Sequence, residues 1–133
     1  MPNMIIVSPD PVGFKLDLDV FQEASRAKFG QHATLVRTKN ADSPVDVTTQ
    51  VDRPGEPSFQ IFHYRGGDMI STDGTGDRVL EVALWVRSLL PDDLGMRIWL
   101  VDQGYHGHVE LVPGMTEEDV KSGWIDHAEF PPE

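Results

Sequence analysis

The stretch from Asp77 to Leu90 constrains the fold more than any other part of the chain. Only Glu81, Arg87 and Ser88 interrupt its apolar residues, which are Val79, Leu80, Val82, Ala83, Leu84, Trp85, Val86, Leu89 and Leu90. A helix this apolar needs most of its surface buried. Pro91 cannot continue a helix. The sequence therefore predicts one long helix at about 77–90, packed across the face of a sheet.

The sequence on both sides of this helix is rich in strand and hairpin signals. Within 45–51, valines alternate with polar residues, which is typical of a half-buried strand. Pro54-Gly55 fits a type II turn, while Gly66-Gly67 and Gln103-Gly104 fit hairpin turns. We expect strands at 4–7, 33–38, 45–51, 58–65, 68–72, 96–101 and 107–112. Because short turns join neighbouring strands, the central ones should form an antiparallel meander.

Two shorter helices complete the expected fold. The first covers about 19–29, with Asp19 as the capping residue and Gly30 at the end. The second covers about 117–123, where Thr116 and Asp119 form a capping box. The sequence thus predicts an α+β fold: a mostly antiparallel sheet of about six to seven strands with one long apolar helix on a face. One domain spans 1–133, and its acidic tail at 124–133 is expected to be partly ordered.

Composition limits compartment and partners. The net charge of −11 disfavours nucleic acid, because phosphates attract lysine and arginine. The chain has no cysteine, which excludes disulfides, thiolate metal sites and a cysteine nucleophile. No apolar run is long enough for a signal peptide or a membrane span. We expect a cytoplasmic protein with no membrane association and no cofactor.

The negative charge is concentrated near the C-terminus. Six acidic residues and one basic residue lie between Thr116 and Glu133. This run is either a solvated surface or a docking surface for a cationic protein. Trp124 either covers the core or supplies an apolar anchor at the centre of that surface. The predicted partner-binding residues are Asp92, Asp93, Glu117, Glu118, Asp119, Trp124 and Asp126.

The function that these features favour is a small acidic module that binds a basic protein partner. An immunity protein that neutralises a basic toxin is one version of this hypothesis. No serine lies in a Gly-x-Ser-x-Gly motif, and the glycines of 73–77 lack the lysine of a phosphate-binding loop. The sequence therefore indicates a binding protein rather than an enzyme.

A second hypothesis concerns the stretch from Asp102 to Glu110. In a strand, residues two apart share a face, so His106, His108 and Glu110 would lie together. With Asp102 they could bind a metal ion or a small ligand, including in a metal-dependent enzyme. The plainer interpretation is an exposed hairpin, with both histidines facing water and Tyr105 facing the core.

Overall fold

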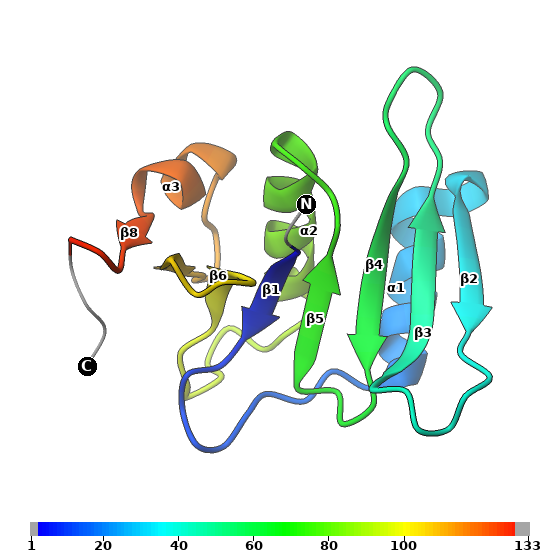
Figure 1. Ribbon diagram of the computed structural model, residues 1–133, viewed down its shortest axis with the longest axis horizontal. Helices are drawn as coiled ribbons and strands as arrows, with labels where there is room; N and C mark the ends of the chain where they lie inside the picture. The colour runs from blue at the N-terminus through cyan, green and yellow to red at the C-terminus, as the bar shows by residue number, and fades with distance from the viewer. Residues whose placement is uncertain (1–2, 130–133) are drawn as a thin grey trace.

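The computed structural model describes residues 3–129 (Figure 1). Its strands are β1 (Met4–Val7), β2 (Ala33–Arg37), β3 (Val45–Val51), β4 (Phe59–Tyr64), β5 (Met69–Thr72), β6 (Trp99–Asp102), β7 (Gly107–Glu110) and β8 (Ile125–Asp126). Its helices are α1 (Leu18–Phe29), α2 (Asp77–Ser88) and α3 (Glu117–Ser122), with a 3-10 turn, η1 (Gly30–His32). The predicted α+β class is confirmed. The described residues form one sheet of eight strands, slightly more than expected.

The sheet has the order β2-β3-β4-β5-β1-β6-β7-β8, and every neighbouring pair is antiparallel. Strands β2 to β5 form the predicted meander. Strand β1, the first in the chain, lies between β5 and β6 and pairs with both (Figure 1). It therefore joins the meander to the C-terminal hairpin of β6 and β7.

One row of register partners crosses six strands and forms the floor of the core. The side chains are all at most 2% exposed: Val47, His63, Ile70, Ile6, Leu100 and Val109. Five of them are apolar, so their burial provides much of the stability of the sheet. The exception, His63, is discussed next.

His63 is polar, yet it is fully buried in this row. Its Nδ1 lies 2.7 Å from Asp46 Oδ1, and its Nε2 lies 2.7 Å from the backbone oxygen of Leu16. The carbonyl of Leu16 can only accept, so Nε2 carries the hydrogen of that bond. These bonds tie the segment before α1 to the middle of the sheet.

Helices α1 and α2 lie side by side behind the sheet in Figure 1. Trp85 of α2 contacts Phe21 and Phe29 of α1, with ring centroids 6.0 and 5.5 Å apart. As predicted, α2 is buried on most sides, although it ends at Ser88 rather than at 90. The guanidinium of Arg87 donates to the carbonyl of Leu111 and to carbonyls just past the end of the helix. This bonding explains how an arginine is buried there.

Several local predictions are confirmed. Gly30 ends α1 with a φ of 55°. Gly55 has a φ of 77°, and Glu56 N–H bonds the carbonyl of Arg53, as a type II turn requires. Thr116 and Asp119 form the expected capping box at the start of α3.

Other local predictions were wrong. Asp17, not Asp19, precedes α1, and its side chain makes no capping bond. Gly66-Gly67 is not a two-residue turn, since the loop between β4 and β5 spans 65–68. Within this loop, Gly67 N–H donates to the carbonyl of Tyr64, and the carbonyl of Gly67 accepts from Leu16 N–H. Residues 96–98 do not extend β6, since Arg97 N–H donates to the carboxylate of Asp10 instead of a strand.

The remaining sequence predictions concern membranes and the tail. None of the helices formed by residues 3–129 has the length and apolar character needed to cross a bilayer. Within the acidic tail, residues 124–129 continue from α3 through β8. Phe130 and the prolines after it lie outside the described residues.

Candidate functional site

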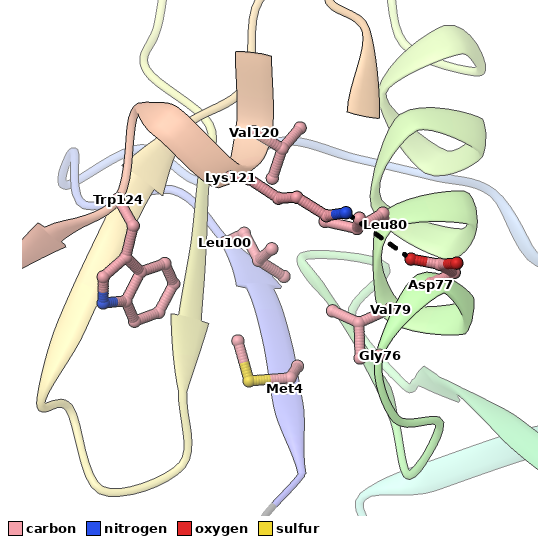
Figure 2. Close-up of a pocket in the computed structure, with 9 residues that line it drawn as sticks. All are labelled: Met4, Gly76, Asp77, Val79, Leu80, Leu100, Val120, Lys121 and Trp124. Atoms are coloured by element: carbon pink, nitrogen blue, oxygen red, sulfur yellow. Dashed lines mark ion pairs between the residues drawn. The ribbon is translucent and has the colours of Figure 1, made fainter. Parts of the chain in front are cut away.

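An open apolar groove of about 660 Å³ lies between α2, α3 and the sheet (Figure 2). Met4 of β1 and Leu100 of β6 come from the sheet, and Trp124 stands on the side opposite α2. The full lining is Met4, Gly76, Asp77, Val79, Leu80, Leu100, Val120, Lys121 and Trp124. Ligand pockets commonly measure roughly 300–1,000 Å³. The groove is thus large enough to receive several apolar side chains of a partner.

Local interactions fix the wall formed by Trp124. Thr116 Oγ1 accepts from Asp119 N–H at 3.1 Å, and Asp119 Oδ2 accepts from Thr116 N–H at 3.0 Å, which starts α3 at a defined residue. Val120 then anchors α3 in the core. The indole of Trp124 lies directly over Gly107, where any Cβ atom would overlap it. Trp124 therefore covers β7, yet it remains 37% exposed beside the groove.

Lys121 and Asp77 face each other across the groove. Lys121 Nζ lies 3.7 Å from Asp77 Oδ1, and the dashed line in Figure 2 marks this pair. The side chains are 56% and 72% exposed. An exposed pair of this kind contributes about 0–1 kcal/mol. It offers little resistance to an entering partner.

The predicted acidic residues fall into two places. Glu117 and Glu118 lie on α3 and Asp126 on β8, on either side of Trp124 in sequence, and all three are exposed. The structure places Asp92 and Asp93 in the loop after α2. The groove lies at the other end of α2, beside the first residues of this helix. Asp92 lines a separate hollow of about 360 Å³ with the 112–115 loop. No Lys, Arg or His within residues 3–129 forms an ion pair with any of these carboxylates.

A second hollow beside the groove shows the opposite arrangement. It measures about 410 Å³ and is lined by Lys28, Arg53, Glu56, Asp77, Arg78, Glu81 and Glu117. Arg53 bonds both oxygens of Glu81 at 2.9 and 2.7 Å, and Arg78 lies 3.2 Å from Glu56. The hydrogen bonds from Arg53 hold the pKa of Glu81 below its usual value, against the effect of burial. Most carboxylates here are neutralised within the chain.

Of the two histidines of the β6–β7 hairpin, only His106 faces water as the exposed-hairpin interpretation predicts. His106 precedes β7 and is exposed, and its Nδ1 lies 2.7 Å from Asp102 Oδ2. Burial works to raise the pKa of Asp102, but bonds from His106 and Gly107 outweigh it and hold that pKa below its usual value. His106 is therefore paired with Asp102, whereas His108 is paired with His127.

His108 is buried, which contradicts the prediction that it faces water. Its ring stacks on Trp99 with centroids 3.7 Å apart, and its Nδ1 lies 2.7 Å from His127 Nε2. Burial first, and then the charge of His127, lower the pKa of His108. Tyr105 was expected in the core, but it is 48% exposed and has a φ of 55°. Its backbone oxygen accepts from His127 Nδ1 at 2.8 Å, so the turn serves to hold the tail.

This arrangement does not support the metal-binding hypothesis. Between residues 3 and 129, no three histidine, aspartate or glutamate side chains are placed to share a metal ion. Comparison with known proteins adds no relative: no family model, curated protein or solved structure matches the chain.

Sequence reasoning missed two features of this region. Groove residues such as Leu80 and Leu100 look like any other core residues in sequence, because whether they line a groove depends on where α3 packs. The sequence also holds no local motif for the role of His127, because its partner His108 lies 19 residues before it.

Proposed function

We propose that this protein binds a cationic protein partner at the apolar groove and the acidic surface of α3 and β8. The observation that most supports this proposal is that three features of a binding surface occur together. An exposed tryptophan, an open apolar groove and carboxylates without an ion-pair partner in the described chain lie next to one another. A basic toxin neutralised by this surface is one partner with the required chemistry.

The two components have different roles in this proposal. Burying the exposed indole of Trp124 and the neighbouring apolar walls removes apolar surface from water, and tryptophan is frequent among residues that dominate binding energy. Glu117 and Glu118 add long-range attraction that speeds association with a basic protein. A partner that fits both presents an apolar side chain surrounded by lysine or arginine.

Affinity capture with matched variants tests the proposal. The purified chain is immobilised and exposed to extract of its own source cells at about 0.05 and about 0.5 M salt, because salt screens exposed charges. We expect one basic protein to be retained at low salt. Trp124→Ala should weaken its binding, measured by calorimetry with the purified partner, by about 30-fold.

The control separates a specific surface from general acidity. Glu117→Lys/Glu118→Lys and Glu23→Lys/Asp42→Lys change the net charge equally, but the second pair lies on α1 and in the loop before β3. Only the first pair should abolish retention. Equal loss in both double variants, or no protein retained at any salt, contradicts the proposal.

A further inference from the structure

His127 fastens the end of the described chain to the β6–β7 hairpin. Its backbone N–H donates to the carbonyl of His106 at 2.8 Å, and its Nδ1 lies 2.8 Å from the carbonyl of Tyr105. Its Nε2 meets Nδ1 of His108 at 2.7 Å, and its ring packs edge-on against Tyr105. Together with the short pairing of β8 with β7 and the indole of Trp124 over Gly107, these contacts hold residues 124–129 in place.

The hydrogens in this arrangement can be counted from the acceptors. Because His127 Nδ1 faces a carbonyl oxygen, it must carry a hydrogen. The distance of 2.7 Å between His127 Nε2 and His108 Nδ1 leaves room for only one hydrogen between them. We call the segment closed when the two rings are in contact and open when they are separated. The closed pair can bind at most one proton beyond its neutral form, whereas two separated imidazoles can bind two.

Even the first of these protons is disfavoured while the pair is closed. His108 is 8% exposed and lies flat against Trp99, and removing a charged ring from water is unfavourable. This burial lowers the pKa of His108. The open segment thus takes up more protons than the closed one.

Charged groups on the surrounding elements do not reverse this balance. Glu110, on β7 itself, favours a charged His108, while Arg97, whose guanidinium lies over Trp99, disfavours it. On the turn, His106 is already paired with Asp102. Asp126 and Glu129 belong to the same segment as His127, so they stay near it whether the segment is closed or open.

We propose that His108 and His127 form a pH-sensitive clamp, which holds residues 124–129 on β7 at neutral pH and releases them in acid. The direction of this pH dependence follows from proton linkage, because the state that binds more protons becomes more populated as the pH falls. Release begins below about pH 6.5, the ordinary pKa of histidine. Since Trp124 lies at the start of this segment, release also removes one wall of the groove; that consequence for partner binding rests on the proposed function.

Amide hydrogen exchange of the ¹⁵N-labelled full chain tests the clamp without any partner. We expect the protection factor of the His127 amide to fall about tenfold or more between about pH 7.5 and about pH 5, since each proton taken up changes the equilibrium up to tenfold per pH unit. The amide of Ile6, in the centre of the sheet, should keep its protection and so show that the fold is intact.

Two variants distinguish the clamp from general loosening in acid. Glutamine can donate to the Tyr105 carbonyl and accept from His108, but it does not titrate. His127→Gln leaves only His108 able to take up a proton on opening, so the protection factor should fall by less in acid than it does in the unmodified chain. His127→Ala should leave it open at both. His32→Gln, at the opposite edge of the sheet, should respond like the unmodified chain.

An unchanged His127 protection factor in acid overturns the clamp, as does a His127→Gln chain that opens like the unmodified one. Neither result bears on the capture experiment, which is performed at neutral pH. Conversely, an absence of any captured partner leaves the exchange result intact.

Discussion

Around the start of α2, carboxylates lie against arginines, whereas on α3 they do not. Arg53 contacts both Glu81 and Glu56, and Lys28 lies 3.3 Å from Glu81. On α3, by contrast, Glu117 and Glu118 are exposed and have no ion-pair partner within residues 3–129. Both regions are acidic, and they lie beside the same hollow.

The difference shows that net charge alone does not locate a binding surface. Paired carboxylates contribute to folding, and a partner gains little from them because they are already neutralised. Unpaired ones add self-repulsion to the folded state and remain available to a cation. Of the four predictions below, one concerns the buried core as a reference and three concern the two regions.

The largest effect is expected in the core, where His63 occupies one position of an otherwise apolar row. His63→Leu fills the space but leaves the half-buried carboxyl group of Asp46 and the carbonyl of Leu16 without their hydrogen-bond partner. We expect the free energy of unfolding, measured in urea, to fall by about 3 kcal/mol. His32→Leu, whose side chain makes no bond of this kind among residues 3–129, should change it by less than about 0.5 kcal/mol. A comparable loss in both variants would refute the role given to His63.

Arg53→Met removes the main ion pair of the first region but keeps an apolar side chain against Phe29 and Phe59. We expect a loss of about 1.5 kcal/mol at neutral pH. The pKa of Glu81 is lowered in the folded chain, so this stability is present above pH 4.5 and lost as pH falls below it. Urea unfolding at several pH values should show the two chains converging in acid. A pH-independent difference contradicts the assignment, and the exposed Arg26→Met serves as control.

Thr116→Ala tests the start of α3 in the second region. It removes the hydroxyl that accepts from Asp119 N–H, and we expect a loss of about 1 kcal/mol. Thr116→Ser should recover most of it, since serine caps equally well. Thermal unfolding followed by circular dichroism measures both. If serine and alanine behave alike, the capping bond does not contribute.

Lys121→Ala should have the smallest effect on stability, below about 0.5 kcal/mol, because its pair with Asp77 is exposed. Binding should respond in the opposite direction. Removing the cation from the groove makes the surface more negative, so a cationic partner should bind more tightly at low salt. Calorimetry with the captured partner checks this, and weaker binding would show that Lys121 itself contacts the partner.

Much of the fold could be predicted because its signals are local. Alternation over 45–51, the apolar run of α2 and the capping box at Thr116 each depend on neighbouring residues alone, and the structure confirms all three. The site was less accessible. His108 was expected in water because strand alternation places it on the face opposite Val109, but contact with Trp99 and His127 buries it there.

The sequence by itself determined the helices, most strands and the excess of negative charge, since each follows from residue types at short spacing. Only the tertiary structure decided that β1 lies at the centre of the sheet, that α3 leaves a groove beside Trp124, and that His127 reaches His108. Such contacts join residues far apart in the chain. Their physical cause is the packing of whole elements against one another, which no local pattern records.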